Sequence, residues 1–219
     1  MCFLNVKKFT VLSRARSGSE VLMGCIMQHP NLNVYGEIFN YYREENMFAN
    51  PEGSEYLTRE ELVSICSKDR CVQAHSKYDG FKLLLCHLND SIKEYLKEIN
   101  VFTLYRRNLL QRYVSEMVAR ESNDWASDKD ILKSIYIDVD DLKNDILVTK
   151  KWYKENDKNT NLKVYYEDGI LNNAKMIFES LGVSEFVPKI TNKKRILRPM
   201  SQVISNYDEV KHFDHANYF

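Results

Sequence analysis

Short apolar runs alternate along this chain with longer segments of helical periodicity, and this alternation constrains the fold more than any other feature. The runs are rich in β-branched and aromatic residues, which favour buried strands. Strands that alternate with helices build a parallel sheet whose two faces are covered by helices. The sequence therefore predicts an α/β fold of three layers with a central, mostly parallel sheet. The expected strands are residues 7–13, 81–88, 101–105 and 162–166.

Six helices are expected between and after these strands. Ser91 is expected to cap one of them, and Gly182 to close another at its C′ position. A long stretch rich in Asp and Lys is expected to be largely helical, with these residues on its solvated face. The expected helices are residues 21–29, 91–99, 109–120, 125–155, 170–181 and 202–206.

Length and charge exclude several classes of protein. The 219 residues suit a single domain, residues 1–219. Lys plus Arg and Asp plus Glu both number 31, which argues against a dedicated nucleic-acid binder, because such a domain is expected to be basic. The longest apolar runs fall far short of the roughly 20 residues that a membrane-spanning helix needs. The N-terminus lacks the pattern of a signal peptide, so we expect a cytoplasmic protein.

The cysteines fit the same compartment. Their number, five, is odd, and they are scattered, which suits reduced thiols. Cys66, Cys71 and His75 have a spacing that could form part of a metal site, but a fourth ligand is missing. No metal is therefore expected.

A turn rich in Ser and Arg joins the first strand to the first helix at residues 13–20, which read SRARSGSE. Such a turn aims free backbone N–H groups at one point, and the helix dipole adds about half a positive charge there, so an anion is favoured. The Walker A pattern G-x-x-x-x-G-K-[ST] is absent. A purely structural interpretation stays open, because Ser17 and Glu20 have the spacing of a capping box.

Three further motifs follow this turn in a fixed order. The four motifs are the SRARSGS turn, Gly36-Glu37, the segment Tyr105-Arg106-Arg107-Asn108 leading to Ser115, and Tyr166-Glu167-Asp168. In this order they resemble the sulfotransferases that use 3′-phosphoadenosine 5′-phosphosulfate (PAPS), most of all the bacterial carbohydrate sulfotransferases of the nodulation-factor type. The likeness runs from Phe9 to Val210. It implies a P-loop-like fold with PAPS as co-substrate.

The resemblance implies that residues 13–20 form the loop that holds the 5′-phosphosulfate. The loop residues expected to contact it are Arg14, Arg16, Ser17, Gly18, Ser19 and Glu20. Arg16 stands where the family has its catalytic Lys or Arg, whose charge would stabilise the bridging oxygen as the sulfuryl group leaves. Glu20 departs from the family, which usually has Thr there. A carboxylate would repel a phosphosulfate, so we expect Glu20 to turn away and complete the capping box.

The resemblance also implies a site for the 3′-phosphate within residues 105–115, made by an Arg at a strand end and a Ser on the next helix. Ser115 lies eight residues after Arg107, which is the usual spacing, whereas Arg106 lies directly at the strand end. Either arginine could hold the phosphate, since the guanidinium fork bonds phosphate oxygens in pairs. The basic segment 189–206 would close over the nucleotide. Its expected contacts are Lys194, Arg195 and Arg198.

Sulfuryl transfer to a hydroxyl group needs a general base. The cytosolic members of the family use a His close after a strand Lys. Here Lys82 remains as a possible contact to the sulfate, but Leu84 stands where the His would be. Glu37 is the better candidate for the base, because the bacterial relatives place a carboxylate in this region.

The leading prediction is a PAPS-dependent sulfotransferase that acts on a hydroxyl group of a carbohydrate or glycolipid. Two alternatives stay open. One is a P-loop-type nucleotide or sugar kinase, against which the missing Walker lysine counts. The other is a non-catalytic relative that keeps a nucleotide pocket, an interpretation that Glu20 favours.

Overall fold

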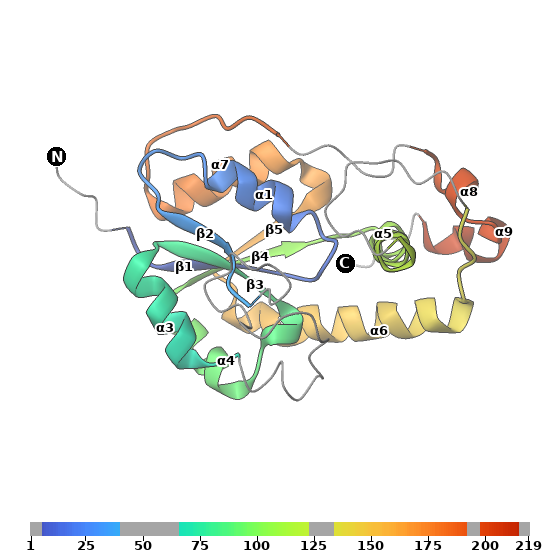
Figure 1. Ribbon diagram of the computed structural model, residues 1–219, viewed down its shortest axis with the longest axis horizontal. Helices are drawn as coiled ribbons and strands as arrows, with labels where there is room; N and C mark the ends of the chain where they lie inside the picture. Colours follow the sequence, from blue (N-terminus) through green and yellow to red (C-terminus); the bar gives the residue numbers. More distant parts are fainter. Residues whose placement is uncertain (1–5, 40–65, 123–133, 192–197, 215–219) are drawn as a thin grey trace.

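Five strands form the central sheet of the protein, and every neighbouring pair is parallel (Figure 1). The computed structural model describes residues 6–39, 66–122, 134–191 and 198–214. Its strand order is β2-β3-β1-β4-β5, with β1 in the middle. The predicted P-loop-like α/β fold class is thereby confirmed. The strands are β1 (Phe9–Ser13), β2 (Val34–Glu37), β3 (Gly80–Leu84), β4 (Asn100–Tyr105) and β5 (Leu162–Tyr165).

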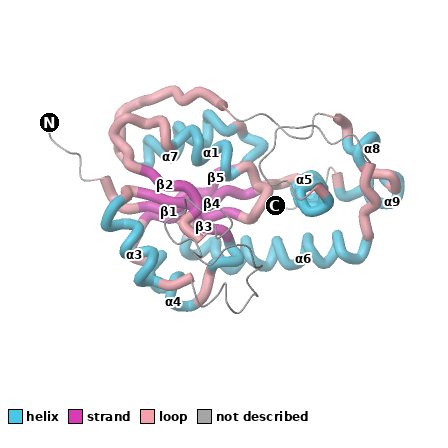
Figure 2. The backbone as a smooth tube through the Cα atoms, in the orientation of Figure 1, coloured by secondary structure: helices cyan, strands magenta, loops and turns pink. Residues whose placement is uncertain are grey.

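Helices cover both faces of the sheet (Figure 2). Two helices, α1 (Ser19–Ile26) and α7 (Ile170–Leu181), lie side by side on one face. The helices on the other face are α3 (Lys68–Lys77), α4 (Asp90–Leu96), α5 (Leu109–Glu121) and α6 (Val139–Asn156). Two short helices, α8 (Met200–Val203) and α9 (Tyr207–Val210), lie at one end of the molecule. No helix in the described part of the chain has the length and apolar character to cross a membrane.

The sheet separates two hydrophobic cores because successive side chains of a strand point to opposite faces. On β1, Phe9 and Val11 belong to the core beneath α1 and α7, whereas Leu12 belongs to the core beneath α3–α6. All three are fully buried. The central strand is thus apolar on both faces, as expected of a strand in a covered parallel sheet.

Several predicted boundaries are confirmed. The helix over 170–181 is observed with the predicted limits, and Gly182 closes it in the left-handed conformation with φ of 66°. The four predicted strands are all present, although the second is shorter than expected. It ends at Leu84, and residues 85–87 turn into a single 3-10 turn. The apolar run continues through this turn because Leu85 is also buried, so hydrophobicity alone extended the strand too far.

Other details of the prediction are wrong. The helix after β3 is capped by Asn89, whose side chain accepts a hydrogen bond from the N–H of Ile92, and not by Ser91. Within the described residues the long helix begins only at Val139, because Asp138 caps it and Ile135 pairs instead with Ile204. Residues 125–133 of the predicted helix lie outside the described residues.

The short elements of the fold also differ from the prediction. The helix expected at residues 202–206 is present only in part, because α8 ends at Val203 and α9 begins at Tyr207. The strand β2 was not predicted, because four residues that include a glycine carry little strand signal.

Candidate functional site

The loops that follow the strands meet at the carboxyl edge of the sheet, where α/β folds bind their ligands. β1 has β3 on one side and β4 on the other, so the strand order reverses at β1. The loop between β1 and α1, residues 14–18, opens at this reversal. Glu37, Arg106 and Tyr166 stand at or just beyond the ends of other strands and reach the same edge.

The loop has an unusual backbone. The N–H of Ser17 bonds the carbonyl of Arg14 at 3.3 Å, which closes a tight turn. Arg16 has φ of 62° and Gly18 has φ of 87°, both in the left-handed region, and Arg16 is the one non-glycine with positive φ in the described part of the chain. Left-handed residues set among right-handed ones turn successive N–H groups toward one point and form a nest that binds anions. Holding an arginine in this conformation costs about 1–3 kcal/mol, and such strain clusters at functional sites.

The capping box predicted from Ser17 and Glu20 is absent. The residue at the N-cap of α1 is Gly18, and no side chain caps the helix there. Glu20 instead forms an ion pair with Lys82 on β3. The cause is tertiary, because β3 pairs with β1 and brings a buried ammonium next to the first turn of α1.

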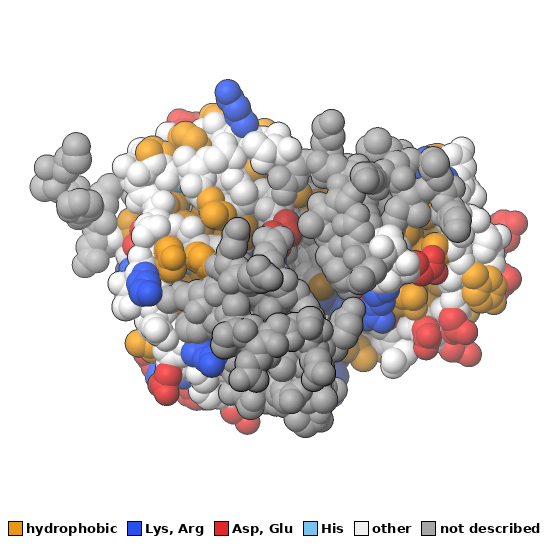
Figure 3. Space-filling view, in the orientation of Figure 1, with side chains coloured by type: hydrophobic (Ala, Val, Ile, Leu, Met, Phe, Trp, Pro, Cys, Tyr) orange, Lys and Arg blue, Asp and Glu red, His pale blue; other side chains and the backbone are white. Residues whose placement is uncertain are grey.

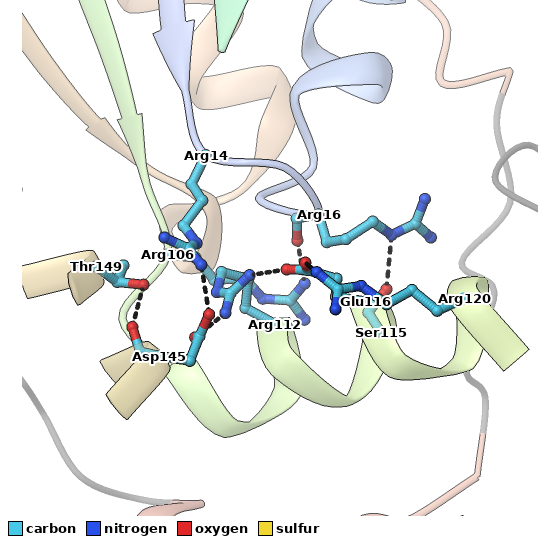
Figure 4. A network of polar contacts seen from close by, with 9 residues as sticks. All are labelled: Arg14, Arg16, Arg106, Arg112, Ser115, Glu116, Arg120, Asp145 and Thr149. Atoms are coloured by element: carbon cyan, nitrogen blue, oxygen red, sulfur yellow. Dashed lines mark hydrogen bonds and ion pairs between the residues drawn. The ribbon is translucent and has the colours of Figure 1, made fainter. Parts of the chain in front are cut away.

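A network of ion pairs joins the start of this loop to α5 and α6 (Figure 4). Asp145 of α6 pairs with both Arg14 and Arg112. Arg112, which has no exposed surface, also pairs with Glu116 at 2.6 Å, and Glu116 pairs with Arg120 at 2.6 Å. Two carboxylates thus serve three arginines.

Some N–H groups of the arginines in this region lack a hydrogen-bond partner among the described residues. The buried atoms Nε and Nη1 of Arg14, Nε of Arg106 and Nε of Arg112 have no hydrogen-bond partner among the described residues. Burial lowers the pKa of Arg14, helped by the nearby charge of Arg112, and burial also lowers the pKa of Arg106. Both guanidiniums remain charged at neutral pH. Buried cationic N–H groups that have no partner among the described residues, beside a loop with the geometry of an anion nest, fit a ligand that carries several negative charges.

Arg106 and Arg16 connect the loop to the elements around it. Arg106 donates from Nη1 to the carbonyl of Arg16 at 2.8 Å, and its guanidinium lies over the ring of Tyr166, 4.7 Å from the ring centroid. Arg16 donates from Nε to the hydroxyl of Ser115 on α5 at 3.1 Å (Figure 4). The structure therefore brings Arg16, Arg106 and Ser115 together.

Arg107 has a different environment. Its guanidinium pairs with Asp168 and lies over the ring of Tyr165, 4.0 Å from the centroid, at the surface. The backbone N–H groups of Arg107 and Asn108 both donate to the carboxylate of Glu167, at 3.0 Å each. Residues 166–168 thus each contact the segment that follows β4.

A β-bulge in β2 determines the position of Glu37, the predicted general base. Val34 pairs with Gly80 and Glu37 with Lys82, so β2 uses one residue more than β3 over the same length. The bulge places Glu37 beside Lys82, with Oε2 2.8 Å from Nζ. Burial alone would lower the pKa of Lys82, but the charges of Glu37 and Glu20 overcome this and raise it. Lys82 is therefore a buried ammonium shared by two carboxylates.

His87 belongs to the same cluster and was missed in the sequence. Its Nδ1 accepts a hydrogen bond from the N–H of Leu84 at 3.2 Å, so the ring proton is on Nε2, which lies 3.8 Å from Oε1 of Glu37. Burial and the charge of Lys82 lower the pKa of His87 to about 3. The signal was a histidine five residues after the strand lysine. It was obscured because the strand was expected to continue through residue 88.

The predicted contacts in the basic C-terminal segment are described only in part. Lys194 and Arg195 lie outside the described residues. Arg198 is partly buried just before α8. The α8–α9 end itself is acidic on its surface, with Asp208 and Glu209 exposed (Figure 3).

The cysteine–histidine spacing does not form a metal site in the part of the chain that the structure describes. His75 accepts from the hydroxyl of Tyr95 and donates to the carbonyl of Phe9, so both of its ring nitrogens are engaged. Cys66 and Cys71 are both buried.

No protein-family model matches the sequence, and no curated protein matches it either. Among solved structures, a sulfotransferase from Alicyclobacillus acidocaldarius is similar, with a TM-score of 0.53 and 13% sequence identity over 87% of this chain and 87% of that chain. Mouse sulfotransferase SULT7A1 complexed with PAP aligns with a TM-score of 0.46 and 13% identity, over 82% of this chain and 60% of that chain. The likeness to the bacterial protein shows that the two chains share a fold.

Proposed function

We propose that this protein is a sulfotransferase that moves a sulfuryl group from PAPS to a hydroxyl group. The observation that carries the proposal is the loop after β1. In it, left-handed Arg16 and Gly18 form an anion nest above buried arginines, some of whose N–H groups have no partner in the described part of the chain. A nucleotide with phosphosulfate and 3′-phosphate groups supplies the charges and acceptor oxygens that such a site needs. The fold shared with a bacterial sulfotransferase supports this choice over other anionic ligands.

On the donor side, the loop N–H groups hold the 5′-phosphosulfate. Arg16 stabilises the negative charge that grows on the bridging oxygen as the S–O bond breaks, because a preorganised cation stabilises the transition state more than the ground state. For this, Arg16 exchanges its hydrogen bond with Ser115 for one to the donor. Ser115 and one of the arginines Arg106 and Arg107 hold the 3′-phosphate, with Arg198 adding charge from the C-terminal segment.

On the acceptor side, Glu37 takes the proton of the attacking hydroxyl group. A new bond forms between the acceptor oxygen and sulfur, the bond from sulfur to the bridging oxygen breaks, and 3′-phosphoadenosine 5′-phosphate (PAP) leaves. Lys82 lies between Glu37 and the loop, so its ammonium contacts the transferred group. We propose a carbohydrate or glycolipid as acceptor, on the basis of the sequence resemblance to carbohydrate sulfotransferases.

One observation favours a second candidate function. Glu20 already forms an ion pair with the ammonium of Lys82. This suits a non-catalytic relative, in which Lys82 does not contact a sulfuryl group and which binds PAP-like nucleotides without transferring sulfate. This candidate differs from the first in a single outcome, since it predicts nucleotide binding without turnover.

A thermal-unfolding titration with PAP, ATP and adenosine 5′-phosphate tests the proposal. A ligand at 100 times its Kd stabilises a protein by about 2.7 kcal/mol, and each kcal/mol shifts Tm by about 2–4 °C at this size. We expect PAP alone to raise Tm by several degrees, and Arg16→Ala to abolish the shift. Lys175→Ala, which removes an exposed lysine on α7, is the matched control and keeps it. A shift with ATP alone indicates a kinase, and no shift with any nucleotide contradicts the proposal.

A further inference from the structure

The ion pair between Glu20 and Lys82 joins two side chains of very different exposure. Glu20 stands in the first turn of α1, and 53% of its side chain is exposed, whereas only 3% of the Lys82 side chain is exposed. A partly exposed carboxylate thus pairs with a buried ammonium. The contact spans 62 residues of sequence and links β3 to the helix that begins at the phosphate loop.

The position of Lys82 in the sheet places this contact beside the loop. Lys82 is in register with Val11 of β1, two residues before Ser13, where the strand ends. Paired residues of neighbouring strands point to the same face, and Val11 faces the core beneath α1. The ammonium of Lys82 therefore emerges under the N-terminus of α1, on the side where the loop N–H groups converge.

Lys82 does not depend on Glu20 for a counter-charge. Glu37 pairs with the same ammonium at 2.8 Å, and its side chain is only 12% exposed. An ion pair with a half-exposed partner contributes little to stability, because solvent competes for the exposed partner. A ligand anion can thus replace Glu20 as a partner of Lys82, whereas the buried Glu37 keeps its ion pair with Lys82.

We infer that Glu20 is a displaceable counter-anion that holds Lys82 in the absence of donor and that the terminal sulfonate of PAPS takes its place. This inference rests on the proposed function. When the 5′-phosphate of PAPS is bound by the loop, its sulfonate extends toward β3 and meets Lys82. The carboxylate of Glu20 occupies that position when no donor is bound. Two negative groups that share one place repel each other, so Glu20 has to move away when the sulfonate arrives.

The two nucleotides of the reaction then respond differently to Glu20. PAPS carries the terminal sulfonate and competes with the carboxylate, whereas PAP ends at the 5′-phosphate and leaves the Glu20–Lys82 pair in place. Glu20 therefore weakens donor binding selectively and reduces the preference of the site for donor over product. PAPS therefore replaces bound PAP less readily than it would without the charge of Glu20.

Isothermal titration of wild type and Glu20→Gln with PAPS and with PAP tests the inference. Glutamine keeps the size of the side chain and removes its charge. We expect PAPS to bind at least fivefold more tightly to the variant and PAP to change by less than twofold. Glu20→Thr, a shorter neutral side chain, is expected to give the same selective gain, and thermal unfolding checks that both variants are folded.

Glu94→Gln is the matched control, because it removes one carboxylate from an exposed ion pair with Lys97 on α4. It is expected to leave the Kd values of both nucleotides unchanged. If the Glu20 variants bind both nucleotides and show no gain for PAPS over PAP, or bind PAPS more weakly, Glu20 is not a displaceable counter-anion, while the proposed function stands. If wild type binds neither nucleotide, both the proposed function and this inference are overturned.

Discussion

The ring of Tyr166 occupies the space in which residue 18 would carry a Cβ atom, because a Cβ built on Gly18 overlaps the ring carbons Cδ2 and Cε2. The end of the loop between β1 and α1 therefore packs directly against the first residue after β5. The guanidinium of Arg106 lies over the same ring. One aromatic side chain thus supports both the loop and the arginine that bonds its backbone.

Gly18→Ala is expected to destabilise the protein. The new methyl group meets the Tyr166 ring, and alanine disfavours a φ of 87°. Together these effects are expected to lower the free energy of unfolding by about 1–3 kcal/mol or more. PAP binding is expected to weaken with it, because the loop cannot keep its shape. Urea unfolding and titration with PAP measure the two effects.

The matched control is Gly24→Ala in the middle of α1, where a Cβ meets nothing within 4 Å. Alanine is expected to stabilise this helix by up to about 1 kcal/mol. If Gly18→Ala were as stable as wild type, the close contact between Gly18 and Tyr166 would be wrong.

Replacing the two adjacent arginines is expected to have different effects. Arg106→Ala removes a buried side chain that bonds the loop carbonyl of Arg16, so it is expected to lower Tm and weaken every adenine nucleotide. Arg107→Ala removes a surface ion pair with Asp168 and is expected to change stability by less than about 1 kcal/mol. Its effect on the ratio of PAP to adenosine 5′-phosphate affinity shows whether Arg107 reaches the 3′-phosphate. Equal Tm values for the two variants would contradict the structural difference between them.

The ion pairs of Arg112 and Arg120 with Glu116 differ in burial and should differ in energetic contribution. Arg112→Met leaves Asp145 and Glu116 without a fully buried partner and is expected to cost about 3–5 kcal/mol. Arg120→Met removes an arginine whose side chain is 60% exposed and is expected to cost less than about 1 kcal/mol. Urea unfolding of the two variants measures both values, and a smaller loss for Arg112→Met than for Arg120→Met would contradict the network.

Two buried histidines are expected to make the protein less stable in weak acid. Burial lowers the pKa of His75 to about 4, and burial with the Lys82 charge lowers that of His87 to about 3, whereas both titrate near 6.5 when unfolded. Between these values the unfolded chain binds more protons, so the free energy of unfolding falls as pH falls. Each histidine contributes up to about 1.4 kcal/mol per pH unit below its unfolded pKa.

Urea unfolding at several pH values between 7.5 and 4.5 measures this slope. His87→Gln is expected to make the slope shallower, whereas His212→Gln, at an exposed histidine, is expected to leave it unchanged. Equal slopes for wild type and His87→Gln would show that folding does not lower the pKa of His87.

Most of the fold could be predicted because its determinants are local. The apolar runs marked the positions of four strands, and Gly182 marked a helix end, since both signals depend on neighbouring residues only. The strand at 34–37 was not predicted, because its determinants are not local. It is stabilised by pairing with β3 across more than 40 residues of sequence, and its own four residues carry almost no strand preference.

The candidate site divides in the same way. The serine- and glycine-rich turn after an apolar strand led to the prediction of an anion-binding loop, because that chemistry follows from a strand, a turn and a helix in succession. The sequence did not indicate which residue pairs with Glu20, where the side chain of Glu37 lies, or whether Arg106 or Arg107 contacts the loop. Strand register, a bulge and the ring of Tyr166 settle those, and each is a contact between segments far apart in the chain. Short-range preferences selected the elements of this protein, and long-range packing then determined which charges face one another.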